Sequence, residues 1–211
     1  MTPGSIRRIA VLVSGRGSNL QALIDAAAAA QVDRAAIAVV ISNVEGAFAL
    51  ERARRAGIPT SFIDHRGWSS RDDFDRALVA ELKRHDVHLV CLAGFMRKVG
   101  APVLEAYPNA ILNIHPSLLP SFPGLHPQRQ ALMHGVKVSG VTVHLVTEDL
   151  DAGPIILQRP VPVLDDDTEE TLAVRILQEE HLAYPEAVRM IVNGGRVEGR
   201  RWVSSPAPRR T

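Results

Sequence analysis

Short apolar segments recur along the first half of the chain, and polar, helix-like segments separate them. The apolar segments are nearly continuous rather than alternating, and they cover residues 9–14, 36–42, 60–64, 87–94 and 110–115. A strand that is covered on both faces has this pattern because neither face meets water, and such strands form parallel sheets. We therefore predict a βαβ series with right-handed crossovers.

The segments between these strands carry helix signals. Ser70 and Asp73 have the spacing of a capping box, and Gly57 and Pro59 follow the second segment in the order that ends a helix. The predicted helices cover residues 20–30, 48–57 and 70–85.

The pattern changes after His115. The apolar segments 138–147 and 154–163 are separated by too few residues for a parallel crossover, so we expect them to be antiparallel. A long helix is predicted over 168–194, and Pro185 inside it should kink or split it. Residues 196–203 are predicted to form a last strand or a hairpin, followed by a flexible tail at 204–211.

No internal repeat and no linker interrupts the sequence. We therefore predict a single α/β domain over residues 1–211 with a Rossmann-like parallel sheet in its N-terminal half. That sheet is expected to continue into a mixed sheet flanked by helices.

Composition narrows the function classes. The formal net charge of +1 gives neither the footprint of a nucleic-acid-binding protein nor that of a membrane-surface protein, so we expect neither partner. The single cysteine, Cys91, lies in an apolar segment and is predicted to fill the core. The N-terminus lacks the shape of a signal peptide, and no apolar stretch approaches the ~20 residues of a membrane span, so we expect a cytoplasmic protein. Both a monomer and a homodimer remain open.

A glycine loop joins the first strand to the first helix. Gly15 and Gly17 lie in it, but Leu20 occupies the position of the third glycine of a dinucleotide fingerprint, and the P-loop Gly-Lys-Ser/Thr is absent. Two interpretations remain. Ser18 or Asn19 could simply cap the helix, or the backbone amides of Gly17, Ser18 and Asn19 could hold one phosphate monoester.

The fifth apolar strand ends in two polar side chains. Asn113 and His115 are two residues apart, so strand alternation points both to the same side, at the edge where α/β sheets bind ligands. An amide beside an imidazole can stabilise an oxyanion and deliver a proton. The loop acids Glu148, Asp149 and Asp151 could supply a carboxylate for the imidazole. The alternative is a histidine that caps the strand and a surface turn of acids.

The other histidines carry no metal-ligand spacing with acids or cysteine, so we predict no metal site. His144 is interpreted as incidental because it lies in the middle of a predicted strand. His126 follows Gly124 in a loop and is a candidate for lining a site.

Several motifs resemble one enzyme family in order and spacing, from about Ile9 to Trp202. They are SGRGSNLQALID, LAGFMRKV, LNIHPSLLPSFPGLH, DAGPIILQ and EEHLAYP. The chain is similar to the phosphoribosylglycinamide formyltransferases of the 10-formyltetrahydrofolate-dependent formyltransferase family. The Asn-x-His-Pro-Ser-Leu-Leu-Pro and Asp-Ala-Gly-Pro segments belong to the whole superfamily, and the Ser-Gly-x-Gly-Ser-Asn loop narrows the resemblance to the glycinamide ribonucleotide branch.

The resemblance implies an activity in purine biosynthesis. The amine of glycinamide ribonucleotide would attack the formyl carbon of 10-formyltetrahydrofolate, a co-substrate, and no metal would take part. Asn113, His115 and Asp151 would form the catalytic triad: Asn113 and protonated His115 stabilise the oxyanion, and Asp151 favours the protonated imidazole. Residues 1–115 would be the nucleotide-binding half, and residues 116–203 the folate-binding and catalytic half.

The binding residues also follow from the resemblance. Gly17, Ser18 and Asn19 would bind the ribose phosphate, and Glu180 would reach the sugar or the glycinamide end. The implied folate-contacting residues are Arg71, Met96, Arg97, Lys98, Val99, Asn113, Thr147, Glu148, Asp149, Leu150 and Asp151.

One departure and two rival enzymes qualify the resemblance. Leu177 stands where many members carry Gln or Lys, which places one polar nucleotide contact in doubt, and the neighbouring Gln178 is a possible substitute. Methionyl-tRNA formyltransferase carries an additional nucleic-acid-binding domain, for which 211 residues are expected to leave no room. Formyltetrahydrofolate deformylase has an N-terminal regulatory domain, whereas the catalytic pattern here starts by Ile9. A nucleotide-binding module without turnover would leave the polar end of the fifth strand unexplained.

Overall fold

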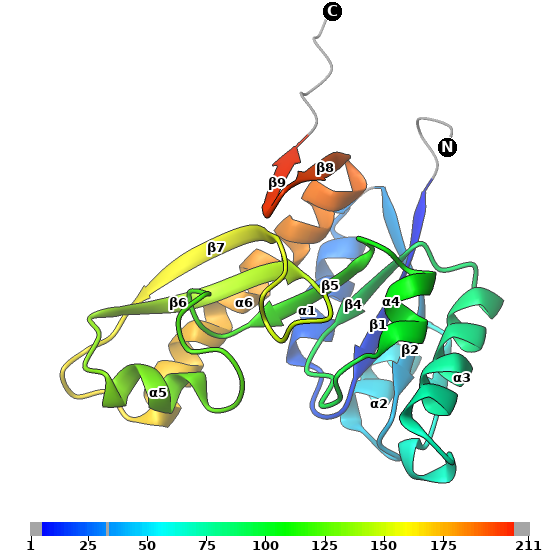
Figure 1. The fold of residues 1–211 in the computed structure, drawn as a ribbon, viewed down its shortest axis with the longest axis horizontal. Helices are drawn as coiled ribbons and strands as arrows, with labels where there is room; N and C mark the ends of the chain where they lie inside the picture. Colours follow the sequence, from blue (N-terminus) through cyan, green and yellow to red (C-terminus); the bar gives the residue numbers. More distant parts are fainter. Residues whose placement is uncertain (1–5, 33, 205–211) are drawn as a thin grey trace, which may run out of the picture.

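A single mixed sheet organises the protein. The computed structural model describes residues 6–32 and 34–204, and within them nine strands follow the order β3-β2-β1-β4-β5-β6-β7-β9-β8 (Figure 1). The pairings from β3 through β5 are parallel, and β6 pairs antiparallel with both β5 and β7. The predicted fold class, a Rossmann-like parallel sheet that continues into a mixed one, is confirmed.

The strands are β1 Arg7–Val13, β2 Ala35–Ser42, β3 Thr60–Phe62, β4 Leu89–Leu92, β5 Ile111–His115, β6 Val138–Leu145, β7 Ile155–Pro162, β8 Gly195–Glu198 and β9 Arg201–Ser204. The helices are α1 Ser18–Ala28, α2 Phe48–Arg55, α3 Arg71–Arg84, α4 Ala101–Ala106, α5 Pro127–Met133 and α6 Glu169–Val192, with a 3₁₀ turn at His65–Gly67.

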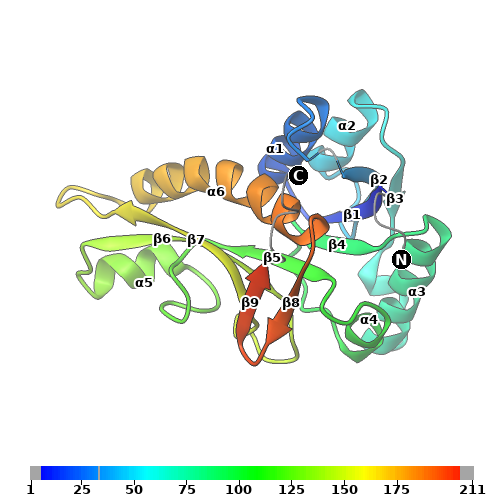
Figure 2. The ribbon, with the colours of Figure 1, turned by 90° about the horizontal axis from the view of Figure 1, so that it is seen from above.

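Helices cover both faces of the sheet, as the continuous apolar strands predict. Figure 2 shows α1, α2 and α6 on one side of the sheet and α3, α4 and α5 on the other. Alternate residues of β1 enter two different cores. Ile9 and Val11 pack with α1, α2 and α6, whereas Ala10 and Leu12 pack with α3 and α4. The described part of the chain contains no helix that is long and apolar enough to cross a membrane.

The long helix α6 runs through Pro185 without interruption, so the predicted split at this proline is wrong. Pro185 lacks an N–H donor and costs the helix one hydrogen bond. The same turns bury Ala183, Tyr184 and Val188 against the sheet, and this burial offsets the loss. Tyr184 also donates a 2.8 Å hydrogen bond to the Leu92 carbonyl, which fastens α6 to β4.

Two short helices, α4 and α5, escaped the sequence prediction. Each has a proline in its first turn, which is where proline is tolerated. The predicted hairpin is present as β8 and β9, and Ser204 ends β9 rather than opening the tail. The rest of the predicted tail, 205–211, lies outside the described residues.

Cys91 is completely buried, which confirms its predicted role in the core. Burial raises the pKa of its thiol to about 12, so the thiol stays protonated and unreactive at neutral pH.

The carboxyl ends of the parallel strands carry the polar residues. Strand order reverses between β1 and β4, where α/β sheets form a ligand crevice. Ser14, which follows β1, donates to the Asn43 side chain at 2.6 Å and accepts from the Met96 backbone N–H at 2.8 Å. These bonds tie the loops after β1, β2 and β4 together at one edge.

Candidate active site

His115 and Asp151 meet at this edge of the sheet. His115 ends β5, and its Nδ1 lies 3.5 Å from Asp151 Oδ2, with side chains that are 7% and 9% exposed. The other ring nitrogen, Nε2, donates to the Phe122 carbonyl at 2.9 Å. Both ring nitrogens therefore face oxygen atoms.

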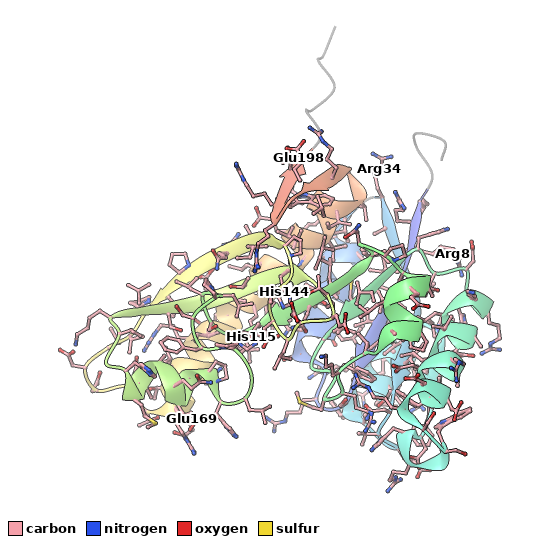
Figure 3. The ribbon with its side chains drawn as sticks, viewed as in Figure 1. Arg8, Arg34, His115, His144, Glu169 and Glu198 are labelled. Atoms are coloured by element: carbon pink, nitrogen blue, oxygen red, sulfur yellow. The ribbon has the colours of Figure 1, made fainter. Side chains whose placement is uncertain are left out.

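Asn113 lies on the same side of β5, as strand alternation predicts, and contacts a residue that sequence reasoning set aside. Its Nδ2 lies 3.2 Å from Nε2 of His144, and that Nε2 lies 3.8 Å from Asp151 Oδ1. Figure 3 labels His144 near His115. His144 Nδ1 donates to the Leu145 carbonyl at 2.9 Å. Burial lowers the pKa of His144, so a neutral ring accepts the Asn113 amide hydrogen. Among the described residues the second Nδ2 hydrogen of Asn113 has no partner, so it is available to a ligand.

Strand register explains why His144 belongs to the site. Asn113 stands opposite His144 in the antiparallel pair of β5 and β6, and His115 stands opposite Thr142. Side chains directly opposite each other in such a pair are neighbours. The signal that could have located His144 is this pairing, which required the register of two strands.

Hydrogen bonds from β6 and β7 hold the loop that follows β5 against the cluster. Thr142 Oγ1 donates to the Ser117 carbonyl at 2.7 Å and accepts from the Leu119 N–H at 3.0 Å. Gln158 on β7 donates to the Leu119 carbonyl at 2.8 Å and to Thr142 Oγ1 at 3.0 Å. These bonds fix the loop that presents the Phe122 carbonyl to His115.

Asp151 is held by its own backbone and by that loop. It has a positive φ of 51°, and its Oδ2 accepts the Gly124 N–H at 2.9 Å. Gly153 brings the acidic loop against the end of β6, since a Cβ there would lie 1.8 Å from the Leu145 carbonyl oxygen. The glycine of the Asp-Ala-Gly-Pro segment therefore sets the position of the carboxylate.

The glycine loop occupies the start of α1. Gly17 is the N-cap of the helix, with φ 71° and ψ 37°, and no side chain caps the helix by a hydrogen bond. The helix-cap interpretation of Ser18 and Asn19 is therefore wrong. The first N–H groups of a helix have no partner within it, so those of Ser18 and Asn19 are available to an anion.

Gly17 is required for packing between helices. A Cβ at Gly17 would lie 2.6 Å from Ala49 Cβ on α2, whereas a Cβ at Gly15 would have no atom within 4 Å. We expect Gly17→Ala to lower the free energy of unfolding by about 1–3 kcal/mol, through strain at positive φ together with this contact. The matched change Gly15→Ala should cost less than about 0.5 kcal/mol, as surface substitutions usually do. Denaturant unfolding of both variants checks this, and equal losses would contradict it.

Asn19 and Glu180, predicted for the same nucleotide site, are in direct contact. Asn19 Nδ2 donates to Glu180 Oε2 at 2.6 Å, and both side chains are buried. Burial raises the pKa of Glu180, and the Asn19 hydrogen bond opposes that rise. Asn19 Oδ1 is buried and has no partner among the described residues. A ligand hydroxyl or amine would satisfy this acceptor.

A cavity of about 560 Å³ lies beside the acidic loop. Five of the predicted folate-contacting residues line it: Arg71, Lys98, Val99, Thr147 and Glu148. Leu104, Tyr107 and Val146 add apolar walls. The combination of apolar walls, an arginine and a lysine suits a flat ring with a negatively charged extension.

The other predicted folate residues lie outside the lining of this cavity. Met96 and Leu150 are 73% and 59% exposed. The Arg97 guanidinium stacks on the Phe74 ring of α3 at 5.5 Å from its centroid. Asp149 is exposed on the acidic loop. The structure thus brings together part of the predicted folate set.

Two further sequence candidates lie elsewhere. His126 is the N-cap residue of α5, its side chain is 65% exposed, and its Nδ1 lies 3.5 Å from Glu169 Oε1. Figure 3 shows Glu169 well away from His115. Gln178 is exposed on α6, whereas Leu177 is half-buried one turn before Glu180. Gln178 therefore points away from the position that Leu177 leaves apolar. Among residues 6–32 and 34–204, no group of three or more His, Cys, Asp or Glu side chains is arranged to hold a metal ion.

Sequence comparison identifies the family. The formyl transferase family model matches residues 7–188, which is most of the chain. The protein therefore belongs to the formyl transferase family, and the resemblance to the formyltransferases is confirmed.

Individual relatives agree with this assignment. Phosphoribosylglycinamide formyltransferase of Escherichia coli (strain K12) is 45% identical over 186 residues, which cover 88% of this chain and 87% of that protein. The trifunctional purine biosynthetic protein adenosine-3 of Drosophila melanogaster is 52% identical over 189 residues, but this chain spans only 14% of its length. The crystal structure of glycinamide ribonucleotide transformylase 1 from Symbiobacterium toebii superimposes with a TM-score of 0.93 at 55% identity, covering 95% of both chains.

Proposed function

We propose that this protein transfers the formyl group of 10-formyltetrahydrofolate to the amine of glycinamide ribonucleotide, a step of purine biosynthesis. The products are formylglycinamide ribonucleotide and tetrahydrofolate. The observation that carries the proposal is the cluster of Asn113, His115 and Asp151 at the carboxyl end of β5. The family assignment supplies the class of reaction, because a formyl transferase needs a formyl donor of the folate type.

The cluster fits acyl transfer. Attack of the amine on the formyl carbon gives a tetrahedral intermediate with a negative oxygen, and donors arranged beforehand stabilise it. The free Nδ2 hydrogen of Asn113 and a protonated His115 would supply two such donors. His115 would later deliver its proton to the departing folate nitrogen, while Asp151 would help to take up the proton that the attacking amine loses.

His144 takes a positioning role in this proposal. Its neutral ring accepts one Nδ2 hydrogen of Asn113 and so fixes which edge of the amide faces the substrate. His144 contacts Asn113 from β6, the opposite strand, so His115 and Asp151 remain available for proton transfer.

The two substrates would approach from opposite sides of the cluster. The phosphate of the nucleotide would lie on the amides of Gly17, Ser18 and Asn19, with Glu180 facing its sugar or its glycinamide end. The folate would enter the cavity bounded by Arg71 and Thr147. Arg71 suits the glutamyl carboxylate, and the apolar walls suit the pterin.

The identity of the formyl acceptor distinguishes this function from those of the two related enzymes. Purified protein is incubated with 10-formyltetrahydrofolate labelled in its formyl group and with glycinamide ribonucleotide, methionyl-tRNA or water alone. We expect transfer of the label to glycinamide ribonucleotide only. Transfer to methionyl-tRNA would indicate a methionyl-tRNA formyltransferase, and release of formate in water alone would indicate a deformylase.

The buried Glu180 gives a prediction that separates stability from binding. Burial raises the pKa of Glu180, so between its pKa in the unfolded state and its higher pKa in the folded state, the folded protein retains a proton that the unfolded chain has lost. Stability therefore falls as pH rises through the range between these two pKa values. Glu180→Gln keeps an acceptor for Asn19 and removes the buried charge. We expect its Tm at pH 8 to rise, by about 2–4 °C for each kcal/mol gained, while KM for the nucleotide increases roughly tenfold.

Thermal unfolding between pH 5 and pH 8 checks the first part, and initial-rate kinetics check the second. The variant should lose the decrease in Tm that the wild type shows with rising pH. A variant that is less stable at every pH, with an unchanged KM, would remove Glu180 from the nucleotide site.

A further inference from the structure

Helix α2 holds the glycine loop through hydrogen bonds to two of the loop's carbonyl oxygens. The Ala49 N–H donates to the Gly15 carbonyl at 3.1 Å, and Arg52 Nε donates to the Arg16 carbonyl at 2.9 Å. Two successive carbonyl oxygens of the loop are therefore held by one face of α2. Gly17 lets the loop approach that face closely, because its missing Cβ would meet Ala49.

Because α2 holds these two carbonyl groups, peptide geometry determines the direction in which the N–H groups of the same peptides point. In a trans peptide the C=O and the N–H point in opposite directions. The carbonyls of Gly15 and Arg16 point at α2, so the N–H groups of Arg16 and Gly17 point away from it. The Gly17 N–H makes no hydrogen bond to any residue from 6–32 or 34–204.

The Arg52 side chain is itself held in place by two further contacts. Its Nη1 donates to Gln21 Oε1 on α1 at 3.0 Å, and its guanidinium carbon lies 4.9 Å from the centroid of the Phe48 ring. In the described part of the chain it makes no salt bridge. Its neighbour Arg55 lies on the exposed side of α2 and pairs with Glu51 at 2.8 Å.

We infer that Arg52 is a positioning residue for the phosphate of the nucleotide. It fixes the Arg16–Gly17 peptide so that the loop amides converge on one anion, and it links α2 to the first turn of α1 through Gln21. This inference rests on the proposed nucleotide site. Arg52 acts through the backbone of the loop, and its forked guanidinium is what reaches the carbonyl and Gln21 together.

Lysine at this position separates geometry from charge. Arg52→Lys keeps the positive charge but loses the fork that binds two acceptors. Four constants are measured: KM for glycinamide ribonucleotide, KM for its dephosphorylated nucleoside, KM for the folate donor, and the inhibition constant of inorganic phosphate. We expect Arg52→Lys to raise the first and the last by tenfold or more, with the other two constants within about twofold. Arg55→Lys is the matched control and should leave all four unchanged.

A second variant keeps the inference testable if Arg52→Lys folds poorly. Gln21→Leu removes the acceptor of Nη1, together with the 2.9 Å hydrogen bond that Gln21 Nε2 donates to Asp25 on the same helix, and should raise the same two constants severalfold. Wild-type constants in Arg52→Lys would show that charge alone matters and would overturn the inference. An equal loss toward the nucleoside and the folate would also overturn it, because it indicates general damage. If phosphate fails to compete with the nucleotide in the wild type, the proposed nucleotide site itself fails, and the inference with it.

Discussion

Asp151→Asn is expected to lower kcat by several orders of magnitude while both substrates still bind. The change keeps the size of the side chain and an acceptor for the Gly124 N–H, but it removes the charge that lies 3.5 Å from His115 Nδ1. Removing the carboxylate that orients a catalytic histidine costs about 10⁴ in serine proteases, where the geometry survives the change. A loss of similar size is expected here.

A matched variant separates this loss from the general effect of removing a carboxylate. Asp165→Asn removes the same charge from an exposed residue and serves as the control. Near-normal turnover of Asp151→Asn at neutral pH would remove Asp151 from the mechanism.

Asn113→Ala is expected to lower kcat by about 10²–10³, the usual loss for one oxyanion donor. The KM values should change only a few-fold, because the amide acts mainly in the transition state. His144→Ala should give a smaller loss, since in the proposal His144 acts only by orienting the Asn113 amide. Initial rates at saturating concentrations of both substrates give kcat directly. Full activity in an Asn113→Ala protein that merely unfolds at lower temperature would make Asn113 a structural residue.

The polar end of β5 could be predicted because the prediction depends only on residues that are close together in the sequence. Alternation along β5 places Asn113 and His115 on the same face of the sheet. The continuous apolar strands indicate a parallel sheet, and both residues lie at its carboxyl edge. Asp151 was one of three acids in its loop, and spacing alone could not choose among them. The structure brings only Asp151 to His115, through its positive φ and the close approach of Gly153 to β6.

The parts that escaped prediction depend on contacts distant in sequence. His144 reaches Asn113 because of the register between β5 and β6, which no single segment encodes. Gly17 was predicted only as part of the glycine loop, and its missing Cβ makes room for Ala49, whose helix lies elsewhere in the chain. Pro185 was expected to kink or split α6, and the helix is not split, because the packing of its buried face offsets the cost of the proline.

The fate of the formyl carbon tests the central proposal most directly. Wild-type protein is mixed with an equal amount of ¹³C-formyl-labelled 10-formyltetrahydrofolate and an excess of glycinamide ribonucleotide, and the products are identified by NMR and mass spectrometry. The proposal predicts that the label forms an amide on the glycinamide nitrogen, with one tetrahydrofolate released for each amide formed. Label recovered as free formate, or donor that remains intact beside unreacted nucleotide, would contradict it.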